Sequence, residues 1–161
     1  MLEKVLTQQE AEIIQVGVIV KDVSKTIDFL GQLGLGPFQT VAASHPAATV
    51  RGNKAAYSVL TAGVQLGAVQ LELIEYQSGT TVQKEFLENK GEGIHHILFK
   101  VDDLDASIQR FAAQGVEVLQ QDRFVGGGGM AYMGTDNIGG IVFELVQYPK
   151  GYDGKSALTY R

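Results

Sequence analysis

The sequence predicts an α+β fold made of two βαβββ modules that together form a cup-shaped sheet. Two gapless matches within the chain indicate the duplication. Residues 13–30 (IIQVGVIVKDVSKTIDFL) overlay 94–111 (IHHILFKVDDLDASIQRF) at an offset of 81 positions, and 68–76 (AVQLELIEY) overlay 140–148 (GIVFELVQY) at an offset of 72. Because both matches occur in the same order, we expect a first module over 10–78 and a second over 93–150, within one domain spanning 1–161.

Each module is expected to open with a strand whose two faces differ. Apolar residues occupy alternate positions, at Val16, Val18 and Val20 and again at Ile97, Phe99 and Val101. This period of two is typical of a strand with one buried face. We expect the apolar face to pack on the helices, so Gln15 and His96 should point to the opposite surface of the sheet.

A helix follows each first strand. Asp22 and Asp103 stand where an N-cap is expected, because a carboxylate accepts hydrogen bonds from free N–H groups of the first turn. Gly34 and Gly115 are expected to end the helices. Apolar residues recur on one face at helical spacing, at Val23, Ile27 and Leu30 and at Leu104, Ile108 and Phe111.

Three strands should complete each module, with predicted ranges of 37–42, 55–64 and 68–76, then 116–121, 129–134 and 140–148. The segment 44–57 is expected to be a long, mildly basic loop. The connector, 79–92, should hold a short amphipathic helix with Val82, Phe86 and Leu87 inward. The first twelve residues and the tail, 151–161, are extensions whose order the sequence leaves open.

Composition excludes several classes of function. The 161 residues are 45% hydrophobic and 19% charged, which suits one globular domain. The net charge of −5 comes without a basic cluster, so we expect no nucleic-acid partner. No apolar run is long enough for a membrane span, and no signal-peptide pattern opens the chain, so we expect a cytoplasmic protein. Absence of cysteine excludes disulfides, thiolate metal sites and cysteine nucleophiles.

Four polar side chains occupy two pairs of equivalent strand positions in the repeat. Gln15 matches His96, and Glu72 matches Glu144. Imidazole and oxygen donors of this mix bind divalent ions such as Mg, Mn, Fe, Co, Ni or Zn. The alternative is that each residue simply faces solvent from a half-buried strand. The symmetry of the pairs favours a shared metal or polar site.

The segments FLENKGEGIHHILFKVDDLDASI (86–108) and GGIVFELVQYPKG (139–151) resemble the vicinal oxygen chelate superfamily, and most of all its methylmalonyl-CoA epimerase branch. The resemblance extends over about 13–149. It implies paired βαβββ modules, a divalent metal in a cup, a small-molecule substrate and a homodimer. The implied metal ligands fall on Gln15, Glu72, His96 and Glu144. Gln15 stands where the family has His, which should weaken metal binding or shift the preference toward harder ions.

The resemblance also bears on catalysis. The epimerases draw an extra glutamate from the middle strands of the first module, but this chain has no Asp or Glu between Asp28 and Glu72. Glu144, with Glu72 as its counterpart, would then move the α-proton, or His45 would do so from a mobile loop.

Weaker substrate contacts come from two further segments. Arg51 and Lys54 could meet an anionic substrate, although a solvated loop is the simpler explanation. In the epimerase branch the glycine-rich segment lies near the acyl-CoA, which implies contacts at Gly126, Gly127, Gly128 and Gly129. The alternative for these glycines is a flexible hairpin, and they lack the pattern of a phosphate loop.

Three functions therefore remain open. The first is a divalent-metal-dependent isomerase, epimerase or lyase that stabilises an enolate of a small carbonyl or acyl-CoA thioester substrate. The second is a non-catalytic small-molecule binding protein of the bleomycin-resistance type. The third is a ring-cleaving dioxygenase, which Gln15 disfavours because such a site needs two histidines and a glutamate around iron.

Overall fold

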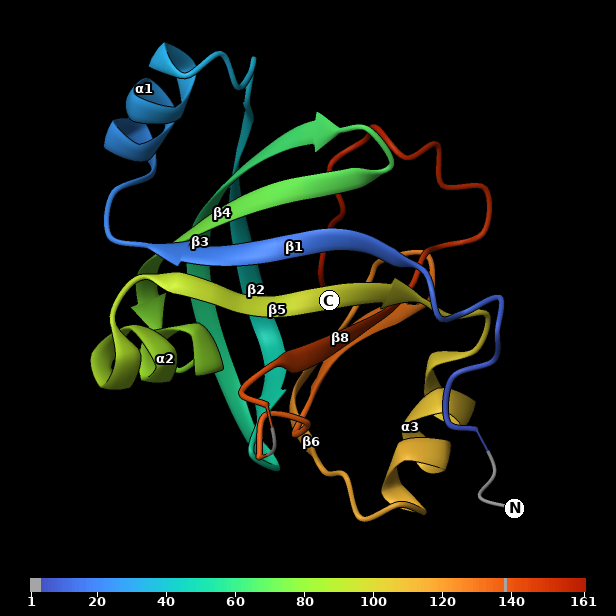
Figure 1. Cartoon of the computed structure of the whole chain (residues 1–161). Coiled ribbons are helices and arrows are strands. Elements are labelled where there is room, and N and C mark those ends of the chain that lie inside the picture. Colours follow the sequence, from blue (N-terminus) through green and yellow to red (C-terminus); the bar gives the residue numbers. More distant parts are fainter. Residues whose placement is uncertain (1–3, 138) are drawn as a thin grey trace.

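The computed structural model describes residues 4–137 and 139–161. The strands form one closed sheet in the order β1-β4-β3-β2-β6-β7-β8-β5, and the helices lie on its outer side (Figure 1). This arrangement confirms the predicted α+β fold of paired βαβββ modules. The elements are β1 (Ile13–Val20), α1 (Val23–Gln32), β2 (Gln39–Val50), β3 (Asn53–Leu66), β4 (Val69–Gly79), α2 (Val82–Lys90), β5 (Gly93–Lys100), α3 (Leu104–Ala112), β6 (Val118–Arg123), β7 (Gly129–Met133) and β8 (Val142–Gln147).

Two seams join the modules within a single chain. At the first, β1 and β5 pair antiparallel, and Gly17 lies opposite His96. At the second, β2 and β6 pair only through Thr49 with Gln121 and Val50 with Gln120. Because both seams are intramolecular, the cup needs no second chain to close it.

The register repeats between the modules. β1 and β4 run parallel with Gly17 opposite Glu72, and β5 and β8 run parallel with Leu98 opposite Glu144. Gly17 and Leu98 are equivalent in the first-strand match, and Glu72 and Glu144 in the last-strand match. The duplication seen in the sequence is therefore also present in the strand pairing.

The helices cover the outer face as the apolar pattern predicts. Val18 and Val20 of β1 pack with residues of α1. Phe99 of β5, and Val101 just after this strand, pack with residues of α3. Both N-caps are confirmed, since Asp22 accepts a hydrogen bond from the Lys25 N–H and Asp103 from the Ala106 N–H. The connector helix α2 is confirmed as well, with Phe86 and Leu87 against the core.

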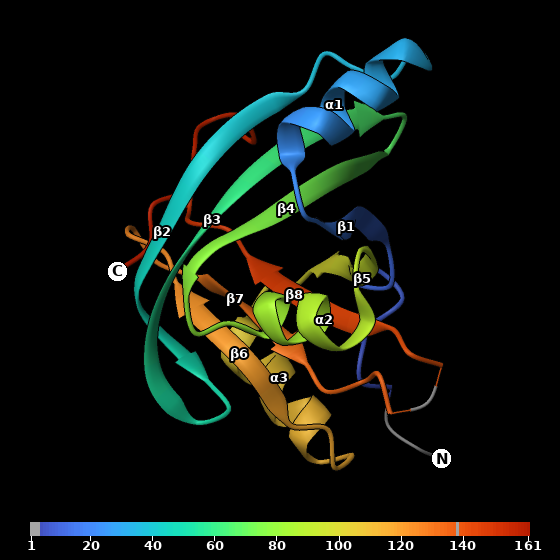
Figure 2. The same cartoon turned by 90° about the vertical axis from the view of Figure 1, so that its left-hand side faces the viewer.

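The segment 44–57 is a β-hairpin, and the expectation of a long loop is wrong. Figure 2 shows β2 and β3 as long curved strands. They are joined by a turn at Arg51 and Gly52, with φ angles of 47° and 77°, the left-handed conformation that tight hairpins favour. Pro46 falls within a register shift between His45 and Ala48, where a strand tolerates proline.

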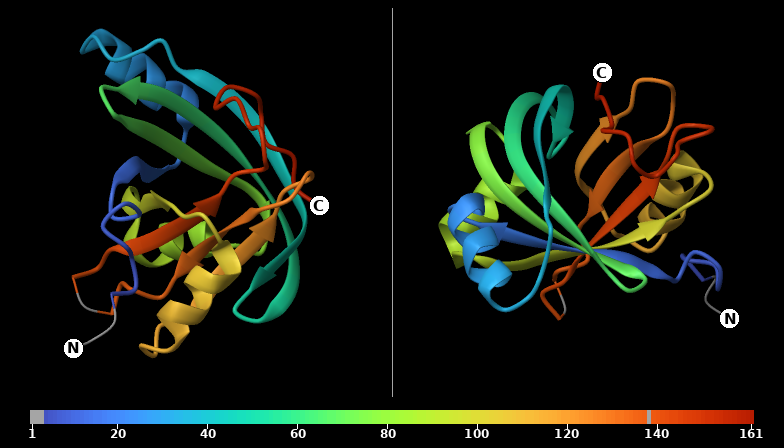
Figure 3. Two further views of the ribbon diagram at one scale, coloured as in Figure 1. Left: turned by 90° about the vertical axis from the view of Figure 1, so that its right-hand side faces the viewer. Right: turned by 90° about the horizontal axis from the view of Figure 1, so that it is seen from above.

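The described residues of both terminal extensions pack against the rest of the fold. The Arg110 guanidinium on α3 donates hydrogen bonds to Glu10 at 3.0 Å and to the Val5 carbonyl at 2.9 Å. The tail lies beside the β6–β7 hairpin (Figure 3), where the Val125 N–H donates to the Thr159 carbonyl at 2.7 Å. Among the described residues, no helix has the length and apolar character that crossing a membrane requires.

Candidate functional site

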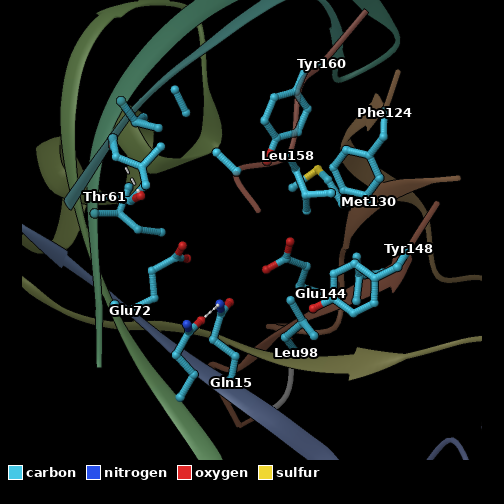
Figure 4. A pocket seen from close by; sticks show the side chains of 18 of the residues that line it. Gln15, Thr61, Glu72, Leu98, Phe124, Met130, Glu144, Tyr148, Leu158 and Tyr160 are labelled. Carbon is cyan, nitrogen blue, oxygen red and sulfur yellow. Dashed lines mark hydrogen bonds between the residues drawn. The ribbon is translucent and has the colours of Figure 1, made fainter. Parts of the chain in front are cut away.

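A cavity of about 320 Å³ lies inside the closed sheet. Both modules contribute to its wall, and the tail lines it as well through residues 154–158 and Tyr160. Figure 4 shows Glu72 and Glu144 extending their carboxylates into this space from facing walls, with Gln15 between them. Three of the four polar side chains of the repeat therefore line one cavity, and the fourth, His96, is fully buried beside it.

Three donor atoms converge at the β1–β5 seam. The His96 Nε2 atom lies 2.9 Å from Glu144 Oε2 and 3.4 Å from Gln15 Oε1. Glu144 Oε2 is buried, and the His96 ring is its one polar neighbour within hydrogen-bond distance among the described residues. The Gln15 amide is held by Gln70, whose Oε1 accepts from Gln15 Nε2 at 2.6 Å. That bond turns the Gln15 carbonyl oxygen toward His96.

The His96 ring is placed by two neighbours. Gly17 lies beneath it, because a Cβ atom at this position would overlap the imidazole. On its other side, His96 Nδ1 lies 3.0 Å from His95 Nδ1. Burial, together with the charges of His96 and Lys90, lowers the pKa of His95 to about 3, so His95 is neutral at physiological pH. Such a partner fixes ring orientation, as outer partners of metal-binding histidines do.

Glu72 has an unusual acidity. Burial and, to a smaller extent, the charge of Glu144 raise its pKa from 4.5 to about 7, against the opposing charge of His96. Two carboxylates that share a cavity cannot both ionise cheaply unless a cation lies between them. The charge arrangement therefore favours either a proton on Glu72 or a bound cation.

The donor set fits a divalent cation. For ligand bonds of about 2.1 Å, octahedral geometry separates neighbouring donors by about 3 Å, close to the spacing of His96 Nε2 from Glu144 Oε2 and Gln15 Oε1. The buried Glu144 Oε2 has no other partner within the described ranges. Over the same ranges no three His, Cys, Asp or Glu side chains cluster closely enough to hold a metal. The third donor of this site is an amide, Gln15, and Glu72 adds charge from the facing wall.

Of the remaining residues predicted to contact substrate, only His45 lines the cavity. His45 lies on strand β2 and lines the cavity, so the expectation that it sits on a mobile loop is wrong. Arg51 is at the β2–β3 turn and pairs with Glu85 at 2.7 Å. Lys54 is exposed on β3, and Arg51 and Lys54 lie outside the cavity wall. Gly126, Gly127 and Gly128 line a separate hollow beside Tyr148 and Lys150, whereas Gly129 is buried at the start of β7.

Sequence reasoning missed several residues of this site. Gly17 leaves room for the His96 ring and Gln70 holds the Gln15 amide, and a lone glycine in an apolar strand was the one available signal for Gly17. Asp122 was hidden because its partner, His45, lies 77 positions earlier. Lys155 and Tyr160 belong to the tail, which showed no periodic pattern. Lys155 is the one Lys or Arg among the described residues of the cavity wall.

A closed pair of βαβββ modules with polar side chains on its inner wall defines a class of cup-shaped proteins with a site between two repeats. A family model for the glyoxalase/bleomycin resistance protein/dioxygenase superfamily matches residues 14–133. The chain belongs to this superfamily.

Within this superfamily, the chain is similar to several curated proteins and solved structures. The uncharacterized protein YqjC of Bacillus subtilis is 36% identical over 91 residues, covering 54% of this chain and 63% of that protein. The mitochondrial methylmalonyl-CoA epimerase of Dictyostelium discoideum is 25% identical over 140 residues, covering 76% of this chain and 84% of the epimerase. A crystal structure of methylmalonyl-CoA epimerase from Mycobacterium tuberculosis is 25% identical with a TM-score of 0.58, covering 89% of this chain and 93% of that one.

Gly17→Ala should displace the His96 ring. The added methyl group would overlap the imidazole, and overpacking of this kind costs about 1–3 kcal/mol of unfolding free energy. Urea denaturation measures that loss. The matched control is Gly31→Ala on α1, where a Cβ meets nothing within 4 Å and where the exchange should stabilise the helix slightly. Equal stability of the Gly17 variant and wild type would contradict the placement of His96.

Glu72 should make the metal-free protein less stable as pH rises. Its native pKa is about 7 against an ordinary value of 4.5, so the folded state retains a proton that the unfolded state has released. The contribution of this proton to the free energy of unfolding is complete below pH 4.5 and lost above pH 7. The free energy of unfolding should therefore fall by about 1–3 kcal/mol over this range. Urea denaturation in chelator from pH 5 to 8 measures it. Glu72→Gln should remove this decrease, and an unchanged pH dependence in that variant would refute the assignment.

Proposed function

We propose that this protein is a divalent-metal-dependent enzyme that enolises a small carbonyl or acyl-CoA thioester substrate, as an isomerase, epimerase or lyase. The convergence of His96 Nε2, Gln15 Oε1 and the buried Glu144 Oε2 carries the proposal. These three residues would hold the ion. A bound divalent ion would act as a Lewis acid on substrate oxygens and stabilise the enolate.

The two glutamates take different roles in this proposal. Glu144 lies against His96 and serves as a ligand, whereas Glu72 has no hydrogen-bond partner in the described part of the chain. Its pKa of about 7 suits a group that accepts and returns a proton near neutral pH. Glu72 would therefore move the α-proton, in contrast to the sequence-based preference for Glu144.

The relatives support a thioester substrate. Several are methylmalonyl-CoA epimerases, and one solved structure, 25% identical with a TM-score of 0.56, is an epimerase in complex with methylmalonyl-CoA and NH4+. Lys155 on the tail adds a cation to the cavity wall, which suits an anionic substrate. A homodimer and a cytoplasmic location stay predictions.

A second candidate is a non-catalytic binding protein of the bleomycin-resistance type. It is favoured by the absence of any Asp or Glu between Asp28 and Glu72, which leaves β2 and β3 without a carboxylate, and by the neutral ligand at Gln15. Aromatic side chains of the wall, such as Tyr57, Tyr148 and Tyr160, would suit an organic ligand.

The metalloenzyme should bind about one divalent ion per chain. Calorimetric titration of chelator-treated protein with Mn²⁺, Co²⁺, Ni²⁺ and Zn²⁺ measures it. His96→Ala and Glu144→Ala should each weaken binding by about 100-fold or more, because each removes a direct ligand. Thr61→Val is the control, since Thr61 lines the cavity without being one of the proposed ligands. Absence of binding by the wild type, together with capture of an organic ligand, would favour the binding protein.

Proton transfer should be visible without knowledge of the physiological substrate. In D₂O, the metal-loaded protein should exchange the α-proton of methylmalonyl-CoA or of another short branched acyl-CoA, which mass spectrometry detects. Glu72→Gln should retain the ion and slow exchange by about 10²–10⁴-fold, the usual size of general acid–base catalysis. Unchanged exchange in this variant would remove Glu72 from the mechanism, and Thr61→Val again serves as the control.

A further inference from the structure

A second ionisable pair lies at the wall of the same cavity, away from the three converging donors, and His45 is the member that lines it. His45 on β2 and Asp122 on β6 come from different modules, and His45 Nδ1 lies 2.6 Å from Asp122 Oδ2. The side chains are 5% and 0% exposed. Asp122 Oδ1 accepts a hydrogen bond from the Arg123 N–H at 2.9 Å, so both carboxylate oxygens are engaged.

The imidazole of His45 is fixed in orientation. It stacks on Tyr57 with a ring separation of 4.1 Å and an interplanar angle of 10°, and Tyr160 covers it at 3.7 Å. A carboxylate only accepts, so the hydrogen bond to Asp122 uses a proton on Nδ1. Nε2 is then the atom free for chemistry, and no described residue hydrogen-bonds to it. Since His45 lines the cavity, this nitrogen is available to a bound molecule.

The pair lies on the wall opposite the proposed metal ligands. Around the closed sheet, the β2–β6 seam stands across from the β1–β5 seam that carries Gln15 and His96. In Figure 1, β1 and β5 cross the front of the sheet, and β2 and β6 lie behind it. A substrate held at the Gln15–His96 end would therefore turn its other face toward His45.

A purely structural role explains the pair poorly. Burying two ionisable groups carries a desolvation penalty, and apolar side chains of similar volume often stabilise a protein at least as well. The pair is already surrounded by apolar packing, because Phe124 and Tyr160 contact each other beside this seam. A histidine oriented by a carboxylate, with its far nitrogen facing a cavity, is the arrangement of a general acid–base catalyst.

We propose that His45 is a second proton-transfer residue of the cup and that Asp122 is its positioning residue; this rests on the proposed enolisation. One face of the substrate would exchange its α-proton with Glu72 and the other with His45. On the His45 face, the α-C–H bond breaks, the proton passes to Nε2, and the electron pair forms the enolate. Glu72 then delivers a proton to the opposite face, which inverts the carbon, and the reverse reaction uses the same groups in the opposite order.

Inversion and exchange, measured separately, test this assignment. Each epimer of methylmalonyl-CoA, as the probe thioester, is incubated in D₂O with metal-loaded protein. Deuterium uptake and inversion are followed separately. His45→Gln should lower inversion by about 10²–10⁴-fold and still exchange one of the two epimers through Glu72. Gly31→Ala on α1, outside the cavity wall, should leave both rates close to wild type.

Two further variants distinguish the loss of a catalytic group from a loss of folding. His45→Ala should regain at least tenfold of its lost inversion in added imidazole, which a structural defect would not do. Asp122→Asn should lower kcat with little change in KM. It should also remove the strongly deshielded Nδ1 proton of His45 from the NMR spectrum, because the partner no longer fixes the tautomer.

The outcomes separate the two proposals. Loss of inversion with one-sided exchange and imidazole rescue supports the His45 assignment. Inversion at the wild-type rate in folded His45→Gln overturns it and leaves the enolising function standing. Loss of exchange for both epimers in that folded variant also overturns the division of faces. If the wild type exchanges neither epimer nor any other short branched acyl-CoA, both proposals fail together.

Discussion

The antiparallel pairing of β1 with β5 is the constraint on which the rest of the site depends. It brings the first strands of both modules together, and it places His96 across from Gly17. The missing side chain at Gly17 leaves room for the imidazole, which then reaches both Gln15 and Glu144. The parallel strands β4 and β8 extend the same register outward, so Glu72 and Glu144 enter the cavity from facing walls.

Burying polar and ionisable groups inside the barrel is costly, and most of these groups are paired with a neighbouring polar side chain. Gln70 orients the Gln15 amide, neutral His95 holds the His96 ring, and Asp122 engages His45. Buried tyrosines add hydroxyls that remain protonated, since burial raises the pKa of Tyr148 to about 12. Glu72 and Glu144 Oε2 stand outside these pairs. Because Glu144 Oε2 contacts only the His96 ring and Glu72 has no hydrogen-bond partner among the described residues, the cavity suits a bound cation or an added proton.

Much of the fold could be predicted from the sequence because each module repeats the same pattern of strands, caps and helices. Equivalent aspartates cap equivalent helices, and alternating valines mark the buried face of β1. The hairpin over 44–57 was missed because its inner face carries small residues and His45 instead of a regular apolar alternation. The four polar positions of the repeat could be predicted, but their partners could not. Gln70, Asp122 and the tail contribute through long-range contacts that leave no periodic signal.

The unequal length of the two seams has a mechanical consequence. Six residue pairs join β1 to β5, whereas two join β2 to β6. Fewer backbone pairs make the β2–β6 seam the weaker of the two, so a force that opens the barrel would separate the strands there first. The His45–Asp122 contact also joins β2 to β6, and it would have to break in the same step. The longer β1–β5 seam would meanwhile keep Gln15 and His96 in register.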